Sequence, residues 1–162
     1  MRALVIDGYN AINKIPRLRG LMDNSLMKAR EKITELAHEY KRKSGSIDRV
    51  YIVFDGRDPY RQKRETLYGT QIFSKTGKGD EKIIRLVSQL SRMHHVQVVT
   101  DDNYIRNHAR VYKASVISCS KFMAFLSKRS KMPQPQKNTN KLTHDKASKI
   151  NRELYKYWCG NI

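Results

Sequence analysis

The sequence predicts an α/β domain with a mostly parallel central sheet flanked by helices. Short apolar runs rich in β-branched residues alternate with longer segments in which apolar residues recur at helical spacing. This alternation is typical of βαβ units, whose strands run parallel. The length of 162 residues fits one domain with a sizeable core, and no internal repeat is visible.

The chain begins with a predicted strand and a long predicted helix. Residues 2–6 form a short, continuous apolar run, which is typical of a buried strand. The next amphipathic segment has apolar residues at helical spacing, and Asn24 or Ser25 is suited to cap its start. We therefore expect a helix that runs to about Lys43.

The middle of the chain contains two predicted strands separated by a basic segment. Residues 49–54 repeat the apolar pattern of the first strand. Residues 57–68 are polar and basic and contain a proline, so we expect a loop there. A shorter strand at 70–74 is followed by a glycine-containing loop at 75–79.

The following elements continue the alternation of helix and strand. A helix is expected at 80–92 because its apolar residues form one stripe. The remaining predicted elements are strand 96–100, helix 103–111, strand 114–118 and helix 120–128.

The composition changes near residue 130. Residues 130–142 are rich in Pro, Gln, Asn and Lys, as in a linker, and 145–158 have the spacing of a final helix. We predict a domain at 1–129 and a basic linker with a C-terminal helix at 130–162, which we expect to pack on the same domain.

The charge of the chain points to a polyanionic partner. Lys and Arg number 33 against 15 Asp and Glu, which gives a net charge of +18. This balance favours nucleic acid, although a solubility device or an anionic membrane surface would also be compatible with it. No signal peptide or membrane-spanning run is recognisable, and the two cysteines lack metal-ligand spacing. We expect a cytoplasmic protein with no membrane partner.

The few acidic residues are concentrated where predicted strands end. Asp7, Asp55 and the pair Asp101-Asp102 each follow a strand, and Asp80 begins a helix. Because the carboxyl ends of parallel strands face one crevice, these side chains are expected to meet there.

Each of these aspartates also has an ordinary structural interpretation. Asp7 could belong to a turn with Gly8, and Asp80 could be a helix N-cap, which contributes about 1 kcal/mol. Asp101 or Asp102 could cap the helix that begins near residue 103. Taken singly, each residue favours the structural interpretation, but their joint placement favours a site.

Clustered carboxylates repel one another and need a compensating cation. Hard oxygen ligands suit Mg²⁺ or Mn²⁺, so we predict a metal bound by Asp7, Asp80 and Asp102. Such a metal can activate a water for in-line attack on a phosphodiester. Asp101 and Asp55 are expected to support the site. Asn10 would orient a phosphate oxygen or a water, or would make a loop hydrogen bond.

Basic and aromatic residues are interleaved in the two loops that border the predicted crevice. This pattern suits single-stranded nucleic acid, in which phosphates pair with cations and bases stack on rings. A solvated basic loop is the alternative. The expected nucleic-acid-binding residues are Arg57, Arg61, Lys63, Arg64, Lys75 and Lys78.

Five short motifs in register resemble the YacP-like NYN family, a branch of the PIN-like nucleases. The resemblance extends from the first residue to about Leu126. The motifs are Asp7-Gly8-Tyr9-Asn10, Ala29-Arg30-Glu31-Lys32-Ile33, Val53-Phe54-Asp55-Gly56, Phe73-Ser74-Lys75 with Gly79-Asp80, and Val99-Thr100-Asp101-Asp102.

The resemblance implies a PIN-like three-layer fold and metal-dependent RNA cleavage. The family is similar to a bacterial ribosome-associated endoribonuclease that cleaves mRNA at the ribosomal A site. Asp7, Asp80 and Asp102 occupy the matching acidic positions. The chain departs from the family pattern at Asp101, where Ser is frequent, and at Ile84, where an acid is common.

Two other functions are compatible with the same features. The chain could be a catalytically weak or inactive module that binds RNA or docks on the ribosome. It could also be a structure-selective DNA nuclease, because PIN-like relatives include such enzymes. Metal-dependent cutting of RNA separates the first alternative from an endoribonuclease, and parallel assays on branched DNA separate the second.

Overall fold

The computed structural model describes residues 1–56 and 63–128, and within them it contains a single six-stranded sheet. The strand order is β3-β4-β2-β1-β5-β6. All neighbouring strands pair in parallel except β3 and β4, which are antiparallel. The predicted α/β class with a mostly parallel sheet is therefore confirmed. The strands are β1 (Arg2–Asp7), β2 (Arg49–Phe54), β3 (Lys63–Thr66), β4 (Gly69–Phe73), β5 (His95–Val99) and β6 (Ser115–Ile117).

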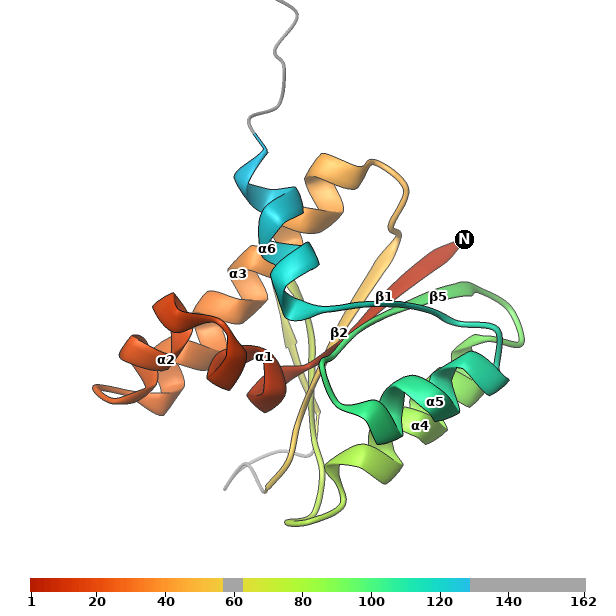
Figure 1. The fold of residues 1–162 in the computed structure, drawn as a ribbon, viewed down its shortest axis with the longest axis horizontal. Coiled ribbons are helices and arrows are strands. Elements are labelled where there is room, and N and C mark those ends of the chain that lie inside the picture. Colours follow the sequence, from red (N-terminus) through yellow and green to blue (C-terminus); the bar gives the residue numbers. More distant parts are fainter. Residues whose placement is uncertain (57–62, 129–162) are drawn as a thin grey trace, which may run out of the picture. The chain divides into compact units, whose positions relative to one another are not determined.

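Helices cover both faces of the sheet and give the domain three layers (Figure 1). Alternate residues of β1 show the division, because Leu4 and Ile6 pack in one core and Val5 packs in the other. The helices are α1 (Gly8–Lys14), α2 (Pro16–Met22), α3 (Leu26–Ser44), α4 (Gly79–Leu90), α5 (Asn103–Val111) and α6 (Cys119–Ser127).

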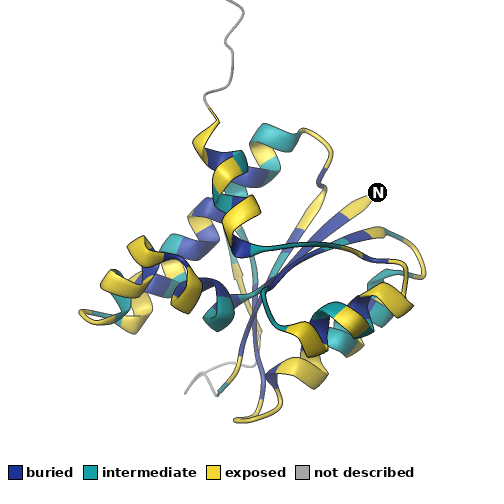
Figure 2. Ribbon diagram, in the orientation of Figure 1, coloured by how far each residue is buried: buried dark blue, intermediate teal, exposed yellow. Residues whose placement is uncertain are grey.

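Each core belongs to one set of helices. The first lies under α1, α2, α3 and α6 and contains large buried side chains such as Ile33 and Phe122. The second lies under α4 and α5 and is formed by aliphatic residues such as Ile83 and Ile105. In Figure 2 the buried residues follow the sheet and the helix faces turned toward it. This burial explains why the apolar stripes of the sequence predicted the long helices.

The central position of β1 creates the crevice in which a ligand site is expected. The chain leaves β1 through α1–α3 to reach β2 on one side, and it returns from β4 through α4 to β5 on the other side. The strand order therefore reverses between β1 and β5. Parallel sheets bind ligands at the carboxyl ends of the strands beside such a reversal.

The predicted strands and long helices agree with the structure to within one or two residues. The helix α3 begins after Ser25, whose side chain accepts a hydrogen bond from the backbone N–H of Lys28. It ends at Gly45, which has the left-handed conformation typical of a helix stop, with φ of 62°.

Three short elements were missed by the sequence analysis. The predicted turn after β1 is the start of α1, because the Asp7 side chain caps this helix, and α2 follows from Pro16. The loop predicted at 57–68 contains the edge strand β3, whose four residues have no apolar alternation. The predicted linker, the terminal helix and the division at residue 130 lie outside the described residues. None of the described helices has the length and apolar character needed to cross a bilayer.

Candidate active site

Three carboxylates from distant parts of the sequence lie near the strand reversal. Asp7 is the last residue of β1, and Asp102 follows β5 as the N-cap of α5. Asp80 is the second residue of α4. The negative charges of Asp80 and Asp102 both raise the pKa of Asp7, and Asp102 raises that of Asp80. The three acids predicted to bind a metal are therefore near enough for their charges to interact.

Asp7 is held in place by two hydrogen bonds and has limited contact with solvent. Its Oδ1 accepts from the backbone N–H of Asn10 at 3.2 Å, and its Oδ2 accepts from the Thr100 hydroxyl at 3.1 Å. Burial raises the pKa of Asp7 to about 6, while these hydrogen bonds act in the opposite direction. A desolvated carboxylate beside other carboxylates is more typical of a functional site than of a helix cap.

Thr100 links the two strand ends that border the reversal. Its hydroxyl donates to Asp7 and accepts from the backbone N–H of Asp102 at 3.1 Å. The residue is 1% exposed, so this connection is shielded from water. Thr100 thus fixes the end of β1 relative to the start of α5, although the sequence analysis assigned it no role.

Asp102 and Asp80 differ in whether their carboxylate oxygens accept hydrogen bonds. Asp102 Oδ1 caps α5 by accepting from the backbone N–H groups of Tyr104 and Ile105, at 2.7 and 3.1 Å. The capping interpretation of Asp102 is thus confirmed. That of Asp80 is wrong, because α4 begins at Gly79 with Lys78 as its N-cap. The Asp80 carboxylate has no hydrogen-bond partner in the described part of the chain, and burial followed by Asp102 and Asp55 raises its pKa.

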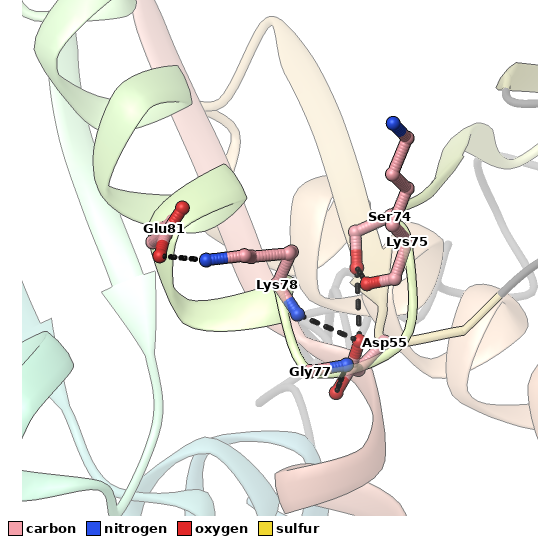
Figure 3. A network of polar contacts seen from close by, with 6 residues as sticks. All are labelled: Asp55, Ser74, Lys75, Gly77, Lys78 and Glu81. Atoms are coloured by element: carbon pink, nitrogen blue, oxygen red, sulfur yellow. Dashed lines mark hydrogen bonds and ion pairs between the residues drawn. The ribbon is translucent and has the colours of Figure 1, made fainter.

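Asp55 organises the loop that leads into α4 (Figure 3). Its Oδ1 accepts from the Ser74 hydroxyl at 3.0 Å and from the Lys78 backbone N–H at 3.3 Å, and its Oδ2 accepts from the Gly77 N–H at 3.0 Å. A Cβ at Gly79 would lie 2.8 Å from the Asp55 Cβ, so only glycine fits there. Asp55 therefore fixes the backbone that presents Asp80.

Replacing Asp55 with Ala is expected to lower the free energy of unfolding by about 1–2 kcal/mol, because three donors of the loop lose their acceptor. Ser74→Ala removes one of these hydrogen bonds and is expected to have a smaller effect. Urea denaturation of the three proteins measures the difference. Equal stability of the wild type and Asp55→Ala would show that Asp55 does not hold the loop.

Asn10 and Asp101 connect the loops on the other side of Asp7. Asn10 Oδ1 accepts from the backbone N–H of Asp101 at 2.9 Å, and Asp101 Oδ2 accepts from the N–H of Cys119 at 3.3 Å. The loop hydrogen bond proposed for Asn10 is therefore present. Cys119 is a buried, free thiol, and burial together with Asp101 raises its pKa. These contacts join the starts of α1, α5 and α6.

The donor chemistry of the site suits a hard cation. Carboxylate oxygens are the ligands that Mg²⁺ and Mn²⁺ prefer. Burial, and to a smaller extent the neighbouring carboxylates, raises the pKa values of Asp7 and Asp80. Within residues 1–56 and 63–128, however, no three His, Cys, Asp or Glu side chains are gathered closely enough to hold an ion as they stand. The three aspartates are near enough to interact electrostatically but do not form a finished coordination group.

Exposed cations lie on β3 and in the loop before α4. Lys63 and Arg64 are exposed on β3, and Lys63 pairs with Glu65 at 2.8 Å. Lys78 contacts Glu81 at 2.6 Å, whereas the Lys75 side chain extends away from Asp55 (Figure 3). Two further residues predicted to bind nucleic acid, Arg57 and Arg61, lie outside the described residues.

A basic hollow between the sheet and α4 was not foreseen from the sequence. Lys63 lies there with Lys82 and Arg85 of α4. The signal was available, because the two α4 residues are three positions apart and so share one exposed face of the helix. The other lining residues are Ile72, Leu86 and Gln89.

Comparisons with known proteins find relatives of this chain in Bacillus subtilis. The uncharacterized protein YacP of Bacillus subtilis is 33% identical over 106 residues, which cover 63% of this chain and 61% of that protein. A crystal structure of a point mutant of Rae1 (YacP) from Bacillus subtilis superposes with a TM-score of 0.63 at 28% identity, covering 78% of this chain and 75% of that one.

A second crystal structure of Rae1 (YacP) from Bacillus subtilis covers 99% of this chain and 97% of the other. Its TM-score is also 0.63, and at 24% identity it supports the fold alone. The YacP-like NYN domain matches residues 4–159, which is nearly the whole chain. On this match, with the fold and the acidic strand ends in agreement, the chain belongs to the YacP-like NYN domain family.

Proposed function

We propose that the chain is a metal-dependent endoribonuclease that hydrolyses phosphodiester bonds of single-stranded RNA. The observation that carries the proposal is that Asp7, Asp80 and Asp102 lie near enough to one another at the strand reversal for their charges to interact, in a chain with a net charge of +18. Membership of a PIN-like nuclease family supports it. By the resemblance of the motifs we extend the proposal to mRNA, including mRNA on the ribosome.

The protein side chains have separate tasks in this proposal. When bound, Mg²⁺ or Mn²⁺ would polarise a phosphoryl oxygen and lower the pKa of a water positioned in line with the leaving oxygen. Asp7, Asp80 and Asp102 would supply carboxylate ligands. Thr100 and Asn10 keep the backbone around Asp7 fixed, and Asp55 fixes the approach to Asp80. Cleavage would leave a 5′-phosphate and a 3′-hydroxyl.

One observation favours a second function, that of an RNA-binding module without cleavage. The carboxylates of the described residues are not gathered into a ligand group, whereas the basic hollow of Lys63, Lys82 and Arg85 is present. In that case the protein would bind RNA or dock on the ribosome, and the acids would serve only as caps and loop anchors.

Incubation of the full chain with labelled single-stranded RNA is expected to give cleavage that requires Mg²⁺ or Mn²⁺ and stops with EDTA. The reason is that the carboxylates can act on a phosphodiester only through a bound cation. A branched DNA substrate run in parallel tests the DNA nuclease alternative. As a readout independent of activity, Mn²⁺ should raise the melting temperature of the wild type by binding the native state. RNA that is bound but never cut, with no thermal shift, would favour the binding module instead.

A further inference from the structure

Arg30 is surrounded by three aromatic rings at the carboxyl edge of the sheet. Its guanidinium carbon lies 5.5 Å from the ring centroid of Tyr9, 5.4 Å from that of Phe54 and 5.1 Å from that of Phe73. Its Nη2 also donates a hydrogen bond to the Tyr9 hydroxyl. Cation–π contacts of this kind hold a guanidinium in one orientation.

The positive charge of Arg30 is not balanced by a carboxylate. Among the residues that the structure describes, the ion pairs involve other cations, and the Arg30 Nε is buried with no hydrogen-bond partner. The residue as a whole remains partly exposed. Nη2 is bonded to Tyr9, so within the described residues Nη1 is the donor group that is neither buried nor hydrogen-bonded. A fixed guanidinium with such a donor group is well suited to bind an anion, and phosphate is the anion that its planar fork matches best.

The place of Arg30 connects it to the acidic site. Each ring that surrounds it directly precedes a residue of the site or its supporting loop, since Tyr9 is followed by Asn10, Phe54 by Asp55 and Phe73 by Ser74. The arginine projects from α3, on the face of the sheet opposite α4. The exposed cations near α4 and Arg30 therefore lie on the two sides of the strand ends.

We propose that Arg30 binds a backbone phosphate of single-stranded RNA that passes along the carboxyl edge of the sheet. The proposal rests on the proposed function for the identity of the ligand, and it adds a phosphate-binding residue on the α3 side. Tyr9 is a positioning residue for this contact, because its hydroxyl and ring orient the guanidinium without touching RNA.

The test measures binding of a short fluorescein-labelled RNA to the full chain in EDTA by fluorescence anisotropy at several salt concentrations. Arg30→Met keeps much of the packing volume and removes the charge. It is expected to bind about tenfold more weakly, with the slope of log affinity against log salt reduced by about 0.7. Arg30→Lys, which keeps the charge and loses the fork, should fall between the two proteins. Arg42→Met removes an exposed charge from the last turn of the same helix and is the matched control.

Two further measurements separate a phosphate contact from a packing role. Thermal melts test whether Arg30→Met is folded. If its melt is not cooperative, Tyr9→Phe becomes the deciding variant, because it loses only the hydroxyl and should weaken RNA binding about threefold. Equal affinity and salt slope for Arg30→Met and Arg42→Met would overturn the proposal. If Arg30→Met does not fold, an RNA affinity of Tyr9→Phe equal to that of the wild type would also overturn the proposal.

The outcome is distinguishable from failure of the proposed function. A reduced salt slope in Arg30→Met together with no metal-dependent cleavage by the wild type would support the phosphate contact and reject the nuclease. Metal-dependent cleavage by the wild type with unchanged RNA binding by Arg30→Met would support the nuclease and reject the phosphate contact.

Discussion

Replacing Asp7 with Asn is expected to reduce RNA cleavage by about 1000-fold or more while the protein stays folded. The substitution keeps the shape of the side chain and its place at the end of β1, but it removes the charge that interacts with Asp80 and Asp102. Loss of a metal-binding carboxylate withdraws several kcal/mol of transition-state stabilisation, and about 4 kcal/mol corresponds to 1000-fold. RNA affinity in EDTA should change little, because the substitution removes no Lys or Arg side chain.

The measurement is the initial rate of cleavage of labelled RNA in saturating Mn²⁺, for wild type and variants purified in parallel. Glu81→Gln is the matched control, because it removes an acid beside Asp80 in the first turn of α4. Glu81 is exposed and its carboxylate contacts Lys78 at 2.6 Å, so its removal should leave cleavage within about threefold of wild type. An Asp7→Asn protein as active as Glu81→Gln would reject the proposed mechanism.

The acidic part of the site could be predicted because two simple rules determine it. Apolar runs identified the strands, and a parallel sheet places all carboxyl ends at one edge, so Asp7 and Asp102 had to lie near one another. The approach of Asp80 follows from the crossover of α4 between β4 and β5. No long-range contact had to be guessed for these three residues.

Other features depend on contacts that one sequence does not encode locally. The roles of Asp55 and Asn10 were uncertain because each accepts from backbone groups of segments distant in the chain, Gly77 in one case and Asp101 in the other. Arg30 looked like one cation among 33 Lys and Arg until its three rings were located.

The missed elements have the same explanation. The helices α1 and α2 have seven residues each, too few for a clear periodic pattern. The strand β3 is stabilised by pairing with β4 rather than by an apolar face, so its sequence resembles a loop. Local propensity is a weak guide wherever tertiary pairing determines the structure.

The stability of the wild type is expected to fall as the pH rises from about 4 to about 7, relative to that of Asp7→Asn. Burial, followed by Asp80 and Asp102, raises the pKa of Asp7 from its ordinary value of 3.8 to about 6. The folded state therefore holds this proton more tightly than the unfolded state, and the stability that it provides is complete below about pH 4 and lost above about pH 6. This difference between the folded and unfolded pKa of Asp7 corresponds to about 3 kcal/mol in the free energy of unfolding, or about 2 kcal/mol after allowance for the remaining solvent contact of the side chain.

Asn resembles the protonated carboxyl, so Asp7→Asn should match the wild type near pH 4 and be about 2 kcal/mol more stable at pH 7. Urea denaturation across this range, in EDTA, gives the two curves. Asp23→Asn, at an exposed aspartate after α2, is the control and should run parallel to the wild type. An aspartate kept only as a helix cap would leave the wild type and Asp7→Asn about equally stable at neutral pH, because Asn and Asp cap helices equally well. A variant that is more stable at neutral pH and has lost cleavage would mean that Asp7 lowers the stability of the fold because the site needs its charge.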